Sequence, residues 1–216
     1  VAYEKVGQVD RAIEAYKASI TRHNDNTLAY TNLGTIYHKQ GLYDMANEAY
    51  KQALTNNPYF PLSHNNLGNT YERIGDSEKA LAEYREALKI DDTYADAHNN
   101  LGAVYLKKGI QDKALVEFQK AAQLNPDHRD AHYNLGIAYA GKGLYVEAIH
   151  ELNLAIKYNP TDYSAYRDLG ILYFGYKKDI KKSLYYLHES LRLTHDPVET
   201  EKVKEMIDAI KKGHVF

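Results

Sequence analysis

The sequence contains no cysteine and no tryptophan, and neither sign of charge dominates it. Without cysteine there are no disulfides and no thiolate metal sites, although this does not identify the compartment, which stays open with the cytoplasm favoured. A formal net charge of −2 gives no bulk attraction for nucleic acid or for a membrane surface. No apolar run approaches the roughly 20 residues of a membrane-spanning helix, so membrane insertion is not expected.

A leucine–glycine pair recurs with a constant step of 34 residues. It occurs at Leu33-Gly34, Leu67-Gly68, Leu101-Gly102, Leu135-Gly136 and Leu169-Gly170. Three residues after each of these glycines stands a tyrosine, and in the first four copies a second glycine follows after seven. Five copies in phase indicate a repeat protein.

Each copy has the pattern of two helices joined by a tight turn. Leu33 and Tyr37 are four residues apart and share a face of the first helix, while Gly34 removes a side chain where a neighbouring helix passes close. Gly41 can adopt a positive φ and end that helix. The inner stripe of the second helix, at i, i+4 and i+7, is Ala46, Tyr50 and Ala53. The apolar face of one pair is therefore covered by the next pair.

These residues and this period resemble the tetratricopeptide repeat family. The resemblance implies an all-α fold, a right-handed superhelical solenoid of antiparallel helix pairs with a C-terminal capping helix. The predicted parts are a partial first repeat over 1–26, full repeats over 27–60, 61–94, 95–128 and 129–162, an irregular repeat over 163–197 and the capping helix over 198–213. Because the phase places Gly7 at a turn, we expect the chain to begin part-way through a first helix, as a fragment of a longer array.

The last repeat departs from the pattern in its turn. Lys177 stands where the turn glycine is expected, and one extra residue then restores the register. After Pro197, apolar residues recur at the spacing of an amphipathic helix, which we interpret as a cap on the stack. Continuation into further helices is the alternative.

The resemblance also implies a ligand groove along the first helices. The sixth position of successive repeats holds Asn32, Asn66, Asn100, Asn134 and then Asp168. A carboxamide both donates and accepts hydrogen bonds, so such a row can grip a peptide backbone whatever its side chains are. The row is similar to the asparagine ladder of the O-linked N-acetylglucosamine transferases. A role in helix packing alone is the competing interpretation, and the residues leave both open.

Other predicted groove residues surround this row. They are Asn65, Asn69 and Asn99, the cations Arg73 and Lys107, and, towards the C-terminal end, Tyr133 and Arg167. The two cations suit an acidic side chain or a terminal carboxylate. Near Ile171 and Phe174 the groove becomes apolar, which indicates either a pocket for hydrophobic ligand side chains or a surface covered by the irregular turn. The clamp that some family members use for chaperone C-termini is missing, because Thr31 and Thr35 replace its residues.

His64, His98 and His132 recur every 34 residues, a spacing that invites a metal interpretation. Each lies on a different hairpin, however, whereas zinc ligands converge within about 2.1 Å of one ion. Their position is usually filled by a packing ring, so a packing role is favoured. No catalytic residue, metal site or cofactor is predicted, and the chain is not expected to be an enzyme.

The predicted function is a scaffold that binds an extended peptide or partner segment in its concave groove, without nucleic acid. One alternative is the recruiting arm of a larger enzyme or of a secretion or assembly complex. Another is a self-assembly module, in which the truncated N-terminal hairpin of one copy stacks on the end of another.

Overall fold

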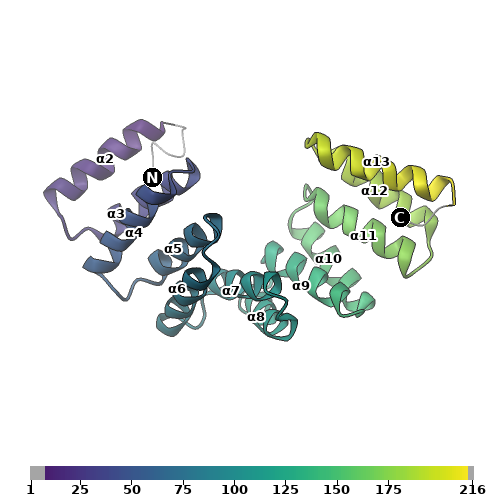
Figure 1. Cartoon of the computed structure of the whole chain (residues 1–216), viewed down its shortest axis with the longest axis horizontal. Helices are drawn as coiled ribbons and strands as arrows, with labels where there is room; N and C mark the ends of the chain where they lie inside the picture. The colour runs from purple at the N-terminus through teal and green to yellow at the C-terminus, as the bar shows by residue number, and fades with distance from the viewer. Residues whose placement is uncertain (1–7, 214–216) are drawn as a thin grey trace. The chain divides into compact units, whose positions relative to one another are not determined.

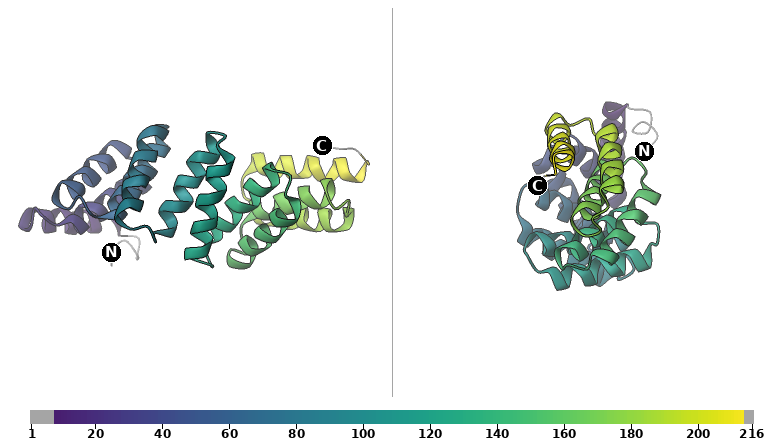
Figure 2. Two further views of the ribbon diagram at one scale, coloured as in Figure 1. Left: turned by 90° about the horizontal axis from the view of Figure 1, so that it is seen from below. Right: turned by 90° about the vertical axis from the view of Figure 1, so that its right-hand side faces the viewer.

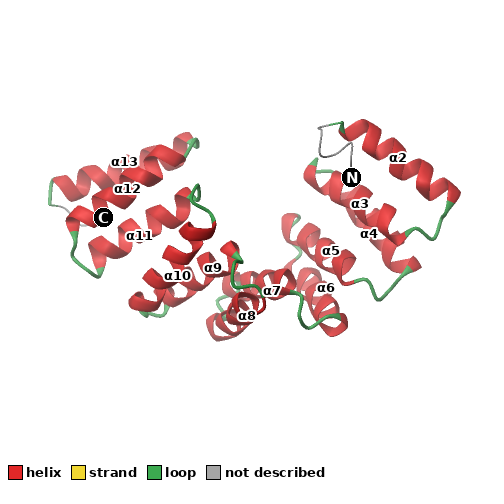
Figure 3. Cartoon of the chain, turned by 180° about the vertical axis from the view of Figure 1, so that it is seen from behind, coloured by secondary structure: helices red, strands yellow, loops and turns green. Residues whose placement is uncertain are grey.

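The computed structural model describes residues 8–213, and every regular element among them is an α-helix (Figure 3). The helices are α2 Val9–Arg22, α3 Thr27–Lys39, α4 Tyr43–Asn56, α5 Pro61–Arg73, α6 Ser77–Ile90, α7 Ala95–Lys107, α8 Gln111–Leu124, α9 Arg129–Gly141, α10 Tyr145–Tyr158, α11 Tyr163–Gly175, α12 Ile180–Leu193 and α13 Pro197–Lys211 (Figure 1). The predicted all-α class of paired helices is confirmed. Gly7, which the repeat phase places at a turn, lies outside the described residues.

The chain divides into two compact units, residues 1–108 and 109–216. In the first unit, helix α3 packs on α4 and α5 on α6, and the pairs meet where α4 contacts α5 and α6 contacts α7. In the second unit, α9 packs on α10 and α11 on α12, and α10 contacts α11. Each unit is thus a stack of helix pairs that cover one another's apolar faces.

The first helices of successive pairs begin 34 residues apart, at Thr27, Pro61, Ala95, Arg129 and Tyr163. Side-chain caps and a first-turn proline fix several of these starts. The Asn26 side chain accepts a hydrogen bond from the Ala29 backbone at 2.9 Å, and the carboxylate of Asp162 caps α11 in the same way. At the other end of α3, Gly41 adopts a φ of 75°, which releases the chain into the turn before α4.

Inside each pair, the glycine of the leucine–glycine motif lets the two helices approach closely. A β-carbon added at Gly34 would lie 2.7 Å from a ring carbon of Tyr50, and one added at Gly68 would lie 2.6 Å from a ring carbon of Tyr84. In the second unit, Gly136 stands against Leu152 at the same 2.6 Å. Since contacts this short are not tolerated, the glycine is required wherever the large residue of the second helix is buried.

The turn between α11 and α12 spans residues 176–179, one residue longer than the turn between α9 and α10, which spans 142–144. The predicted insertion is therefore present. The positive φ falls on Lys178 (54°) in place of a glycine, and the Asp179 side chain caps α12 by accepting a hydrogen bond from the Lys182 backbone at 2.9 Å.

Helix α13 closes the second unit by packing against α12, as the yellow helix beside the yellow-green one shows in Figure 2. Val203 and Ile207 of α13 form a buried cluster with Leu187 of α12, and Phe174 of α11 lies against this cluster. The capping helix thus covers one of the apolar residues that the sequence placed in the groove. None of the described helices has the length and apolar character needed to cross a bilayer.

We predict that Gly68→Val lowers the free energy of unfolding by about 1–3 kcal/mol, because its β-carbon overlaps the buried ring of Tyr84. Urea denaturation followed by circular dichroism measures the effect. Gly175→Val is the matched control, since Gly175 also lies in a first helix but an added β-carbon there meets nothing within 4 Å. Equal stability of the two variants would contradict the close approach.

Candidate functional site

A cleft of about 320 Å³ opens on the first unit, lined by the first helices of three successive pairs and by Tyr84 of α6. Its lining residues are His38, Asn69, Glu72, Arg73, Tyr84, Asn100, Ala103 and Val104. Three of them, Asn69, Arg73 and Asn100, are among the predicted groove residues. The sequence analysis missed His38, although it stands one turn after the predicted groove position Thr35, and it assigned Tyr84 to the core.

The carboxamides of the cleft are oriented by a hydrogen-bond network beneath them. The amide nitrogen Nδ2 of Asn100 donates to Oδ1 of Asn65 at 3.0 Å and to Oδ1 of Asn69 at 2.9 Å. The hydroxyl of Tyr84 also donates to Oδ1 of Asn69, at 2.7 Å. These bonds use the donor group of Asn100 and the acceptor atom of Asn69. The network therefore leaves Nδ2 of Asn69 to donate and Oδ1 of Asn100 to accept.

The same network joins successive repeats. Asn100 is the sixth residue of its repeat, and Asn69 is the ninth residue of the repeat before it. The preceding pair of repeats has the equivalent contact, in which Nδ2 of Asn66 donates to Oγ1 of Thr35 at 3.4 Å. Asparagine at this position thus contributes to packing between repeats, and at Asn100 it also lines the cleft.

His38 enters the cleft as a neutral ring. Burial, followed by the nearby charge of Arg73, lowers the pKa of His38 below its ordinary value. Its Nδ1 lies 2.9 Å from Oγ1 of Thr70, whose hydroxyl donates to the carbonyl of Asn66 at 2.9 Å. Nδ1 must therefore carry the proton and donate to Thr70, which leaves Nε2 of His38 as an acceptor.

The charged residues at the cleft differ in how far the chain already occupies them. The ammonium group of Lys107 lies 3.3 Å from the carboxylate of Glu72, so these two charges balance. Arg73 is exposed, and its Nε donates to the hydroxyl of Tyr43 at 3.3 Å. A guanidinium has five N–H groups in a planar fork, so Arg73 keeps donors for an incoming carboxylate or carbonyl group.

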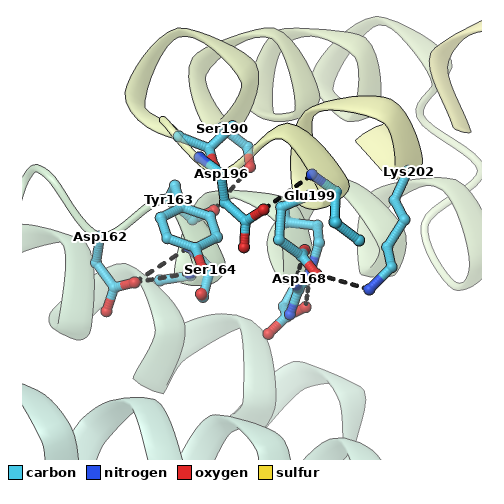
Figure 4. A network of polar contacts seen from close by, with 12 residues as sticks. Asp162, Tyr163, Ser164, Asp168, Ser190, Asp196, Glu199 and Lys202 are labelled. Carbon is cyan, nitrogen blue, oxygen red and sulfur yellow. Dashed lines mark hydrogen bonds and ion pairs between the residues drawn. The ribbon is translucent and has the colours of Figure 1, made fainter. Parts of the chain in front are cut away.

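In the second unit, three predicted groove residues bond to one another and to the capping helix. The hydroxyl of Tyr133 donates to Asp168 at 3.0 Å, and Nε of Arg167 donates to the same carboxylate at 3.0 Å. Arg167 also donates to Glu199 of α13 at 2.7 Å, and Glu199 pairs with Lys202 (Figure 4). Burial raises the pKa of Asp168, against the opposing charge of Arg167. This cluster joins α11 to the cap.

The other predicted residues lie elsewhere on the first helices. Asn32 on α3 and Asn134 on α9 are half-buried, and Asn99 on α7 is buried. They are not among the residues that line the cleft of the first unit.

The repeated histidines are held by hydrogen bonds to acceptors. Nε2 of His64, His98 and His132 lies 3.0, 3.0 and 2.9 Å from the carbonyl oxygen of the residue six positions earlier. Nδ1 of His64 and Nδ1 of His132 lie 2.7 and 2.6 Å from the carboxylates of Glu83 and Glu151. With acceptors on both nitrogens, these two rings are held in the protonated form. Residues 8–213 contain no group of three side chains placed to bind a metal.

Family models match most of the repeat region. A model described as TPR repeat matches residues 34–75 and 74–109, and models described as tetratricopeptide repeat match residues 95–128 and 112–170. No curated protein matches the chain.

Solved structures share the fold. The chain is similar to YrrB, described as a TPR protein with an unusual peptide-binding site, at 22% identity over 89% of this chain and 99% of that one, with a TM-score of 0.65. It is similar to MamA at 28% identity over 80% of this chain and 97% of that one, with a TM-score of 0.64. A structure of the APC/C hetero-tetramer Cut9–Hcn1 gives a TM-score of 0.84 at 22% identity, over 93% of this chain and 40% of that one.

The two doubly bonded histidines predict a specific pH dependence. Burial lowers the pKa of His64, but its bonds to Glu83 and Pro58 outweigh burial and raise it; the bond to Glu151 raises the pKa of His132 against burial. A raised pKa means that these contacts stabilise the fold fully below the unfolded value of about 6.5 and cease to do so as pH rises through the folded value. The thermal midpoint contributed by these rings therefore falls from about pH 6 to pH 8.

Circular dichroism melts of the chain and of Glu83→Gln/Glu151→Gln measure this effect, because the variant removes both carboxylates and leaves the rings. His38, whose pKa is lowered, titrates with the opposite sign in both proteins, so the difference between the two melts isolates His64 and His132. Identical pH curves would contradict the protonated-ring assignment.

Proposed function

The chain belongs to the tetratricopeptide repeat family, and from that premise we propose that the cleft of its first unit binds the backbone of an extended peptide segment of a partner protein. This fold generally serves as a non-enzymatic scaffold for protein partners. The proposal goes further, to a surface and to the way in which it recognises a ligand.

The observation that carries the proposal is the pair of unused polar atoms on Asn69 and Asn100. An extended peptide presents N–H and C=O groups in alternation, and the cleft offers one carboxamide donor and one carboxamide acceptor side by side. Both side chains are already held in place by Tyr84 and Asn65, so binding a peptide costs little further ordering.

The rest of the cleft adds modest selectivity to this backbone recognition. Ala103 and Val104 give it a small apolar wall, and Arg73 suits an acidic side chain or a terminal carboxylate. Nε2 of the neutral His38 accepts one further hydrogen bond. Side chains of several kinds fit such a cleft, since the polar groups that fix the ligand address its main chain.

A substitution that changes one atom tests this proposal. Asn69→Asp keeps Oδ1 for the bonds from Tyr84 and Asn100 but replaces the donor nitrogen with an acceptor oxygen, which repels a peptide carbonyl. Peptides selected from a displayed random library on the immobilised chain serve as probes, and calorimetry measures their affinity. We expect Asn69→Asp to weaken binding about tenfold or more, because one hydrogen bond is lost and a repulsion is added.

Asn57→Asp is the matched control. It adds the same charge to the same unit outside the cleft, and it keeps the acceptor oxygen that holds the Tyr59 backbone at 3.0 Å. Its affinity for the selected peptides should equal that of the unchanged chain. If Asn69→Asp is folded by circular dichroism and binds every selected peptide as tightly as Asn57→Asp does, the proposal is wrong.

A further inference from the structure

A second pocket, of about 350 Å³, lies wholly within the second unit, where α11 ends and α10 begins. Its lining residues are Tyr145, Ile171, Leu172, Gly175 and Tyr176. The rings of Tyr145 and Tyr176 lie with their centroids 5.0 Å apart and their planes tilted by 40°. Both rings remain exposed, at 38% and 41%. The pocket is therefore an open apolar site with two aromatic walls.

The pocket exists because the repeat is irregular at this point. Gly175 is the last residue of α11, and an added β-carbon there would meet nothing within 4 Å. The extra residue in the following turn places Tyr176 beside Tyr145. The exposed side chains of Leu144, Val146 and Ile180, on helix starts next to the pocket, extend the apolar surface. An exposed apolar patch around a concave site is typical of a surface that receives a partner's side chain.

The charge next to this pocket is positive. Lys177, Lys178, Lys181 and Lys182 are all exposed on the turn and on the first residues of α12. The ammonium group of Lys177 lies 4.7 Å from the centroid of the Tyr176 ring, so this charge stands directly on the pocket wall.

The nearby acids do not neutralise these lysines. Asp179 is committed to capping α12, and Glu147 lies in the first turn of α10. Four lysines against these two acids leave a surplus of two positive charges, because 4 − 2 = 2. A partner segment that complements this surface is apolar at one side chain and acidic around it.

We propose that this pocket, which we call the tyrosine pocket, receives a bulky apolar side chain of a partner peptide, with phenylalanine as the best fit, and that the neighbouring lysines select acidic residues on either side of it. The inference rests on the proposed function in that both treat the chain as a peptide-binding scaffold. It names a different surface and the chemistry of the segment that occupies it. Burial of a phenylalanine between two tyrosine rings provides the affinity, and the lysines provide the selectivity.

Fluorescence anisotropy with three labelled peptides tests the specificity of the pocket. One peptide has a single phenylalanine flanked by glutamates, the second replaces the phenylalanine with alanine, and the third replaces the glutamates with serine. We expect the first peptide to bind about tenfold or more tightly than the alanine peptide. It should bind about threefold or more tightly than the serine peptide at low salt, and this second difference should shrink as salt is added. Equal affinities for the three peptides would overturn the proposal.

Gly175→Leu places the binding on the structure, because it fills the pocket from a position where a side chain meets nothing. It should weaken the acidic phenylalanine peptide about tenfold or more. Gly141→Leu is the matched control, since Gly141 is the equivalent residue at the end of α9 and its β-carbon would meet only Nε2 of Gln111, at an ordinary 3.5 Å. Unchanged affinity in a folded Gly175→Leu variant would refute the assignment.

Two further results separate this inference from neighbouring ones. Asn69→Asp should leave the acidic phenylalanine peptide bound; if Asn69→Asp abolishes that binding and Gly175→Leu does not, the cleft of the first unit is the site and the tyrosine pocket is not. Sedimentation of the chain alone tests a second copy as the occupant. A dimer that Gly175→Leu dissociates would show self-association in place of peptide capture and would overturn the proposal, whereas a monomer in both proteins supports it.

Discussion

Close contact between a glycine on the first helix and a large residue on the second is the interaction on which the rest of this structure depends. Gly68 against Tyr84 and Gly136 against Leu152 set the separation of the two helices within a pair. Once that separation is fixed, each pair presents its first helix at the same place in every repeat, and residues about 31 positions apart come into contact. The hydrogen bond between Asn100 and Asn69 is one of these contacts, so the cleft of the first unit follows from packing inside the pairs.

A strict period made most of the fold readable from the sequence. Because every repeat solves the same packing problem, the first helices could be placed at Thr27 and at each thirty-fourth residue after it, and the extra turn residue near Lys178 could be foreseen. The polar detail of the cleft could not. Whether a carboxamide is free depends on the rotamers of Tyr84 and Asn65, which belong to other helices. Arg167 pairs with Glu199 across 32 residues, and no local pattern signals that contact.

The two units carry surfaces of different chemistry on the same scaffold. In the first, fixed carboxamides face a cleft with an apolar wall, and such groups discriminate little among side chains because they bond to the main chain. In the second, Arg167 and Phe174 are covered by the capping helix, and the irregular turn opens an aromatic pocket beside four lysines. Hydrophobic burial there depends on the identity of one side chain. A scaffold with one permissive and one selective surface can bind partners strongly without a large interface.

The central claim is that the cleft of the first unit recognises a peptide through its backbone, and a backbone substitution scan of one selected peptide tests this most directly. In each analogue a single peptide N–H is replaced by N-methyl while every side chain is kept, and calorimetry gives the affinity of each analogue. If the account is correct, one position loses about tenfold or more in affinity because the acceptor oxygen of Asn100 loses its donor, while changes of the neighbouring side chains have little effect. Affinities that follow the side chains and are indifferent to every N-methyl group would contradict it.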